Sequence, residues 1–368
     1  EVTMTRRLLW LWLLILLGFN SCVDQISFPL EKAPRERLIV SGLFTDLEGP
    51  HTVFLSQTTS QAREPLFTGG YFTINDQPRP VKNARVLLLS TSAGIGGQFQ
   101  EVRPGEYELR GKFAQEDGME FFLQIEIEGK IYRSEIQKMP TVIGSDSLSF
   151  SLERARLKDN PDAAQVVIRT ETTLPNQVGG YYLRWMVDEA YFWDLTFFPN
   201  PFNTPPPNCI VFDFPDPERI TLVNGNLLNR PGGKSNLVVA QRLVDQSFLS
   251  RHYFNVQQLS ITQESYEYWR KVREVVNNTG SVFDSPPAAV RGNVFNVEDS
   301  EEVVLGYFEV AKSKVKRIYT TRADIPFFIE KVCEYIPGKS SQLYKPTCLS
   351  CSVFPKSTLA YPDWWFED

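Results

Sequence analysis

Histidine is scarce in this chain, and the basic residues form no cluster. Only two histidines occur among 368 residues, and the net charge is −6. His51 and His252 are not at metal-ligand spacing, so a histidine-rich metal site is not expected. His51 follows the Gly49-Pro50 turn and His252 begins a strand, and we expect both to be surface or edge residues. An acidic chain without a basic run is a poor candidate for nucleic-acid binding.

Recognisable catalytic motifs are also missing from the sequence. No Gly-x-Ser-x-Gly elbow, phosphate-binding loop or dinucleotide fingerprint occurs. Gly94-Ile95-Gly96-Gly97 is expected to be a turn, and no helix follows it that could hold a phosphate. The adjacent acids Asp188-Glu189 are expected to face opposite sides of a strand, which does not make an acid/base pair. We expect no enzyme activity and no cofactor. A glycan hydrolase remains the alternative, without a recognisable site.

Long apolar runs are absent except near the start, where residues 8–19 are apolar. Arg6 and Arg7 precede this run, which is too short for a membrane-spanning helix of about 20 residues. The pattern predicts a secretory signal over residues 1–21. Cys22 follows at the position typical of bacterial lipoproteins, so we expect it to be lipidated and residues 22–35 to form a tether. The alternative is an ordinary secretory signal, with Cys22 in a disulfide.

The remaining cysteines are even in number once Cys22 is set aside. An exported chain is oxidised, so the sequence predicts two disulfides and leaves three pairings open. They are expected to clamp an irregular segment over residues 333–368. A four-thiolate zinc site suits a reducing compartment better, and a redox pair lacks its surrounding βαβ pattern. The four residues are Cys209, Cys333, Cys348 and Cys351.

Abundant phenylalanine, tyrosine and proline favour a mainly β protein. Short strands separated by glycine and proline turns predict an N-terminal β-sandwich over residues 36–140, of the immunoglobulin or transthyretin-like kind. A larger β-rich domain is expected over residues 141–332. Two strands, over residues 303–311 and 314–320, are expected to close it.

One helix is prominent and is predicted over residues 261–278. Ser260 is its expected N-cap, with Gln263 completing a capping box. An apolar stripe at helical spacing supports this helix and is expected to pack in the core. The stripe comprises Tyr266, Trp269, Val272 and Val276.

An aromatic and proline-rich stretch ends in a long loop over residues 197–217, and a loop of this length is more often functional than accidental. Exposed aromatic residues stack on sugars and anchor protein partners. The alternative is that these rings cover the end of the sheet. Trp364-Trp365-Phe366 is expected to dock as a terminal strand. The candidate binding residues are Tyr191, Trp193, Phe197, Phe198 and Phe202.

A series of short motifs follows in order along nearly the whole chain after Cys22, at residues 38–42, 182–185, 256–262, 264–269, 282–287, 290–294, 305–308, 348–351 and 362–365. Together they resemble a family of Bacteroidota outer-membrane lipoproteins of unknown function, typically encoded beside TonB-dependent transporters. The resemblance implies an outer-membrane location, attachment through an N-terminal lipid and a TonB-dependent β-barrel as partner. The family carries no known catalytic residues. The ligand stays open, as does the choice between a periplasmic and a surface-exposed orientation. The alternative function is a structural or assembly subunit of an envelope complex.

Overall fold

The computed structural model describes residues 36–59, 66–68, 71–73, 78–92, 94–111, 113, 118–157, 160, 163–177, 179–195, 207–228, 231–277 and 290–366. The predicted signal, Cys22 and the tether lie outside these residues. So do three candidate binding residues, Phe197, Phe198 and Phe202.

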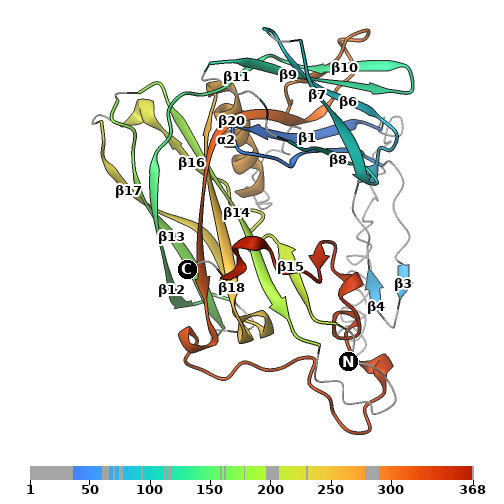
Figure 1. Ribbon diagram of the computed structural model, residues 1–368, viewed down its shortest axis with the longest axis vertical. Helices are drawn as coiled ribbons and strands as arrows, with labels where there is room; N and C mark the ends of the chain where they lie inside the picture. The colour runs from blue at the N-terminus through green and yellow to red at the C-terminus, as the bar shows by residue number, and fades with distance from the viewer. Residues whose placement is uncertain are drawn as a thin grey trace, which may run out of the picture. The chain divides into compact units, whose positions relative to one another are not determined.

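The described chain is mainly β, as predicted, with one α-helix (Figure 1). Most strands join in a single hydrogen-bonded path, in the order β19-β10-β9-β6-β7-β8-β2-β1-β20-β18-β14-β15-β21. Strands β5, β11 and β16 pair beside this path with β2, β9 and β14. In chain order, the first strands of this sheet are β1 Leu38–Thr45, β2 His51–Gln57, β5 Arg79–Pro80, β6 Arg85–Ser90, β7 Gly94–Arg103, β8 Glu106–Leu109, β9 Glu120–Ile127, β10 Lys130–Ser134 and β11 Gln137–Lys138. Its later strands are β14 Tyr182–Trp193, β15 Cys209–Asp213, β16 Thr221–Asn224, β18 His252–Ile261, β19 Val294–Asn296, β20 Leu305–Thr320 and β21 Ser357–Thr358.

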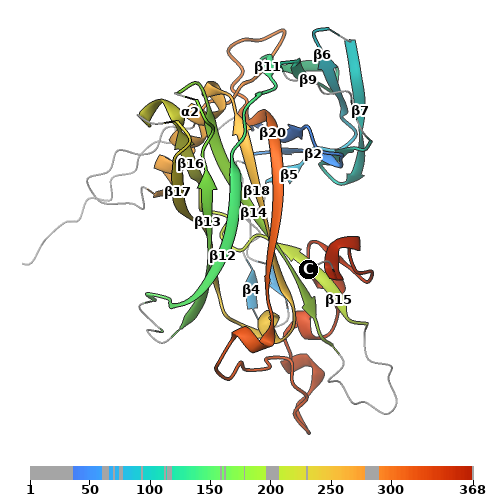
Figure 2. The same ribbon diagram turned by 60° about the vertical axis from the view of Figure 1, so that its left-hand side comes forward.

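Two smaller sheets complete the β-structure. One has the order β12-β13-β17 and runs alongside β14 and β18 (Figures 1 and 2). A second hydrophobic core lies between this three-stranded sheet and strands β14 and β18 of the large sheet. It includes Ile168, Leu183, Trp185 and Phe254. The bounds are β12 Ser145–Arg154, β13 Ala164–Thr173 and β17 Lys234–Leu243, with the hairpin β3 Leu66–Thr68 and β4 Tyr71–Thr73.

The first core lies between strands at the start of the chain. Val40 and Val53 pack there with Leu88, Leu123 and Ile125. Residues from much later in the chain, Val294, Val304, Phe308 and Val310, belong to the same core. The N-terminal strands therefore do not bury their apolar faces without the segment from 294 to 310.

Strand β20 is shared between two pairings, and this corrects the prediction of two separate closing strands. Its first half, from Leu305 to Ala311, pairs in parallel with β1. Its second half, from Lys312 to Thr320, pairs antiparallel with β18. One continuous strand thus connects the strands around the first core to those around the second.

The helix α2 spans Gln263–Asn277, close to the prediction, but its N-cap differs. Ser260 is still part of β18, whose pairing with β14 continues to Ile261. The hydroxyl of Thr262 accepts a hydrogen bond from the backbone N–H of Ser265 at 3.2 Å. The strand pairing therefore delays the helix start by two residues and makes Thr262 the cap.

Three further local predictions are wrong. The predicted loop over residues 197–217 contains a strand, because Cys209–Asp213 form β15 and pair with β14. Gly94 to Gly97 form the beginning of β7 rather than a turn, because they pair with β6 across a bulge. Trp365 is buried as predicted, but in a 3₁₀ turn instead of a strand. The 3₁₀ turns are η1 Gly225–Leu227, η2 Gln246–Leu249, η3 Arg322–Asp324, η4 Ser341–Leu343, η5 Pro346–Cys348, η6 Cys351–Val353 and η7 Asp363–Phe366.

Candidate functional site

A pocket of about 300 Å³ lies where β20 passes from β1 to β18, and we call it the corner pocket. Leu43 pairs with Thr52 on β2 and with Glu309 on β20, so these three side chains share one face of the sheet. The alternate residues face the first core instead. Strands β14 and β18 and helix α2 supply the remaining walls. Its lining includes Leu43, Thr52, Phe54, Arg184, Met186, Gln257, Trp269, Tyr307 and Glu309.

A buried ion pair forms the polar wall of the corner pocket. Nη1 of Arg184 donates a hydrogen bond to Oε2 of Glu309, and the two side chains are 9% and 3% exposed. Oε1 of Glu309 accepts hydrogen bonds from Oγ of Ser265 and from Nε1 of Trp269, the latter at 3.0 Å. Helix α2 therefore supplies two donors that hold this carboxylate in place.

Arg184 retains unused hydrogen-bonding capacity. Its guanidinium carbon lies 3.6 Å from the ring centroid of Trp269, a distance that permits a cation–π contact. Burial lowers the pKa of Arg184, and the charge of Glu309 opposes this effect. No described residue accepts a hydrogen bond from its Nε or Nη2. One edge of a buried cation that lines the pocket is therefore left without a partner.

The rest of the lining is mixed, with an apolar part formed by Leu43, Phe54, Met186 and Trp269. Leu43 and Met186 pack with Trp269 in a small hydrophobic cluster. Phe54 is 51% exposed, which is unusual for a large apolar ring. Tyr307 is stacked against Tyr268 of α2, with ring centroids 4.6 Å apart. The arrangement combines one free cationic edge with apolar walls, which suits the binding of a small ligand.

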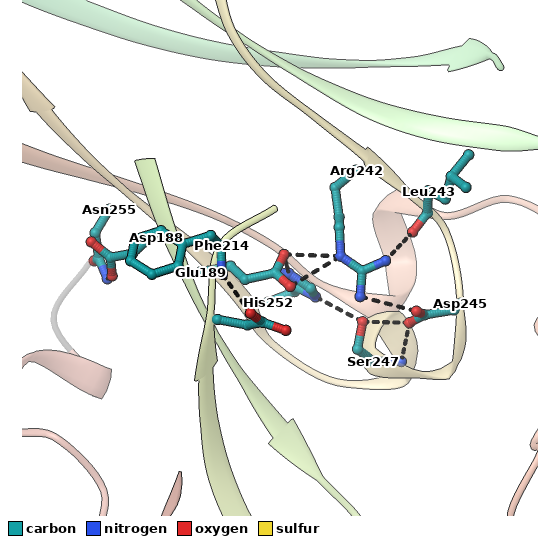
Figure 3. A network of polar contacts seen from close by, with 10 residues as sticks. Asp188, Glu189, Phe214, Arg242, Leu243, Asp245, Ser247, His252 and Asn255 are labelled. Atoms are coloured by element: carbon teal, nitrogen blue, oxygen red, sulfur yellow. Dashed lines mark hydrogen bonds and ion pairs between the residues drawn. The ribbon is translucent and has the colours of Figure 1, made fainter. Parts of the chain in front are cut away.

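A second polar network lies buried elsewhere, as Figure 3 shows. Nε of Arg242 donates to both oxygens of Glu189 at 3.0 Å, and Nε2 of His252 lies 3.0 Å from Glu189 Oε2. Oγ of Ser247 lies 3.2 Å from Nδ1 of His252 and donates to Asp245 at 2.6 Å. Burial lowers the pKa of His252, although the hydrogen bond to Glu189 opposes this effect.

This network resembles a Ser-His-Glu arrangement, but its setting is that of a structural cluster. Ser247, His252 and Glu189 are at most 1% exposed, and none of them lines a described pocket. Oγ of Ser247 is within hydrogen-bond distance of both Asp245 Oδ1 and His252 Nδ1, so the Asp245 carboxylate competes with the imidazole for the hydroxyl proton. Three aromatic rings, of Tyr191, Phe248 and Phe254, enclose His252.

Comparison with known proteins identifies the family but not a function. Residues 23–317 match the model of a domain of unknown function, DUF4249. The chain belongs to the DUF4249 family. No curated protein matches this DUF4249 chain. Among solved structures, a two fibronectin type-III domain segment from chicken tenascin is similar at 17% identity and a TM-score of 0.14, covering 61% of this chain and 89% of that chain. That TM-score is far too low to indicate a shared fold.

Both histidines of this DUF4249 chain are buried, which corrects the prediction that they lie at the surface. His51 alternates with Val53 and Leu55 on the inward face of β2, and its ring contacts Phe44. Its Nδ1 accepts a hydrogen bond from the backbone N–H of Thr45 at 3.4 Å, while its Nε2 is buried and has no partner among the described residues. Burial lowers the pKa of His51 to about 4.

Two of the aromatic binding candidates lie within the described residues. Tyr191 is buried and stacks on His252, with ring centroids 5.1 Å apart. Nε1 of Trp193 donates to the carbonyl oxygen of Thr347 at 2.8 Å, and its ring packs against Phe354. Both side chains therefore contribute to packing around the C-terminal segment.

The four predicted disulfide cysteines form two disulfides, as expected. Cys209 pairs with Cys351, and Cys333 pairs with Cys348. The first bond ties the C-terminal segment to β15. Within the described residues there is no His, Cys, Asp and Glu cluster that could hold a metal ion. No helix in the same part of the chain is long and apolar enough to span a membrane.

Proposed function

We propose that this protein is a non-enzymatic outer-membrane lipoprotein. It would serve a TonB-dependent transporter as an accessory subunit and help to capture or admit its ligand. The proposed anchor is lipidated Cys22, which follows the apolar run of a secretory signal. The resemblance to transporter-associated lipoproteins supports the partner, and two disulfides fit an oxidising compartment. We further propose that residues 36–140 derive from an immunoglobulin or transthyretin-like sandwich.

The corner pocket is the observation that supports the proposed ligand capture. Both oxygens of the Glu309 carboxylate already accept hydrogen bonds, from Arg184, Ser265 and Trp269. That carboxylate is therefore poorly placed to act as a general base. The free edge of Arg184 and the apolar walls can hold a ligand without reacting with it.

An apolar surface on the C-terminal segment supports contact with another protein. Large exposed apolar side chains occur along residues 328–366, and the two disulfides restrain this part of the chain. A lipid anchor confines the protein beside its partner, so a modest patch acts at high effective concentration. The most exposed of these residues are Phe328, Leu343, Leu359 and Phe366. The same surface favours the alternative, a structural or assembly subunit of an envelope complex.

The membrane anchor is tested by Cys22→Ser. We expect this variant to lose labelling by a palmitate analogue and to leave the outer-membrane fraction. The double variant Cys333→Ser/Cys348→Ser serves as a control, because it removes two disulfide-bonded cysteines without changing the anchor. A Cys22→Ser protein that is still labelled and retained contradicts the anchor.

The partner is tested by cross-linking in intact cells, followed by purification of the tagged protein. We expect a TonB-dependent barrel to be the main cross-linked protein. Phe198→Ser and Phe202→Ser should weaken this contact or ligand uptake while the protein melts at its usual temperature. If both variants behave as the parent, Phe198 and Phe202 do not contact the partner or the ligand. Recovery of other envelope subunits without a barrel favours the alternative function.

A further inference from the structure

We propose that the corner pocket binds a small carboxylic acid with an apolar body, and that Arg184 holds the carboxylate. This proposal names the ligand class for the ligand-capture function and rests on it. The carboxylate would accept hydrogen bonds from Nε and Nη2 of Arg184. The apolar body would lie against Leu43, Met186 and Phe54, which line the same pocket.

The guanidinium of Arg184 is already oriented for such a ligand. Glu309 holds Nη1, and the ring of Trp269 lies along the guanidinium face. Nε–H and Nη2–H point to the same side of a guanidinium, and together they match the two oxygens of a carboxylate. Little side-chain entropy is lost when a ligand binds to a group that is already fixed.

The chemistry of the wall favours an acid over an amine. Glu309 is already engaged by Arg184, Ser265 and Trp269, so it has little capacity left for a ligand cation. A cation in the pocket would also face Arg184, which is buried and only partly compensated by one carboxylate. A second carboxylate restores hydrogen bonds that Arg184 lost when it was removed from water.

The size of the pocket limits the body of the ligand. Its volume of about 300 Å³ is at the lower end of the range for small-molecule sites, roughly 300–1,000 Å³. A single aromatic ring or a short aliphatic chain fits this space. Phe54 is half exposed at the pocket and offers a ring face that such a body would cover.

The test is calorimetric titration of the full-length protein in detergent with phenylacetate, with hexanoate and with the neutral analogue phenylacetamide. We expect at least one acid to bind, and phenylacetamide to bind at least about tenfold more weakly than phenylacetate, a difference of about 1.4 kcal/mol. Arg184→Lys keeps the charge opposite Glu309 but loses the two-pronged edge, and should weaken acid binding by about tenfold or more. Arg169→Lys is the matched control, because Arg169 pairs with Glu153 away from the pocket and should leave binding unchanged.

A second variant keeps the proposal testable if Arg184→Lys does not fold. Met186→Trp fills the pocket without removing its donors and should abolish acid binding in a protein that melts normally. Equal binding of phenylacetate and its amide, or unchanged binding by either variant, overturns the proposal. Failure of both acids to bind also overturns it, even when the barrel still co-purifies. Acid binding without any barrel contact would instead retain the pocket and contradict the transporter role.

Discussion

At the residue scale, buried polar side chains are the features that sequence reasoning located least well. The alternation of His51, Val53 and Leu55 carried the signal that His51 faces inward. The neighbouring Gly49-Pro50 turn points instead to the surface, and burial on the inward face of β2 overrides it. Arg184 lies within the short motif at residues 182–185, and no sequence pattern marks Glu309. Their pairing spans 125 residues, and no local pattern reports it.

The burial of His51 predicts a loss of stability in mild acid. Its pKa is about 4 in the folded protein and about 6.5 in the unfolded chain, so the unfolded state binds more protons between these values. Stability is therefore fully present above pH 6.5 and falls as the pH drops from about 6.5 to about 4. His51→Asn keeps an acceptor for Thr45 and removes the titration. We expect a flatter dependence of the urea midpoint on pH in this window, with some slope left from His252. An unchanged slope contradicts the assignment.

Glu189 is predicted to be a key charge for stability. Glu189→Gln leaves Arg242 without the carboxylate that it contacts through Nε, which should cost about 3–5 kcal/mol. Glu171→Gln is the control, because its partner Lys234 is largely exposed, and it should cost less than about 1 kcal/mol. Urea denaturation measures both. Similar small losses for the two variants would show that the buried network adds little.

At the element scale, strands and the helix were predictable where apolar periodicity is strong. The short strands expected between residues 36 and 140 include β6 and β9, and α2 is within two residues of its expected start. The continuous strand β20 was not predictable, because the polar residues Lys312, Ser313 and Lys314 look like a break between two strands. Ser313 in fact faces Leu259 across the sheet, and its backbone N–H is held by Asp46. The continuity of β20 is thus determined by pairing partners that are distant in sequence.

The cap of α2 gives a prediction at the element scale. Thr262→Ala removes the acceptor for the Ser265 N–H and should destabilise the protein by about 1 kcal/mol. Ser260→Ala should cost less, since Ser260 is a strand residue in β18. Chemical denaturation of both variants distinguishes the two possible caps. A larger loss from Ser260→Ala would restore the cap that the sequence pattern suggests.

At the scale of the whole molecule, the parallel pairing of β1 with β20 determines where the corner pocket lies. It places Leu43 and Glu309 side by side, and β18 then brings in β14 with Arg184. The sequence indicated a boundary near residue 140, and it contains no signal that Phe308 and Val310 complete the first core. Long-range pairing of this kind has no local signature, so the site could not be assembled from motifs.

Substitution of Gly306 tests the pairing of β1 with β20 directly. A Cβ at Gly306 would lie 2.0 Å from the carbonyl oxygen of Val40 on β1, and the residue has a φ of +87°. Gly306→Ala should therefore cost more than about 4 kcal/mol or prevent folding. Gly129→Ala is the matched control, with a φ of +85° and no atom within 4 Å of the new Cβ. It isolates the backbone penalty of about 1 kcal/mol. Thermal melts with equal losses would show that the close approach of β1 and β20 is unimportant.

The shared strand also sets the order in which the chain can fold. Asp46 contacts the backbone of Ser313, 267 residues further along, so one edge of β1 has no native neighbour until most of the chain has been made. Closing such a long loop is slow, and an edge that waits unpaired is open to pairing with other chains. In a chain that is still being synthesised, the first core therefore lacks the residues that come from the segment 294 to 310. We expect the earliest strands to stay incompletely paired until residues 305 to 311 close the sheet.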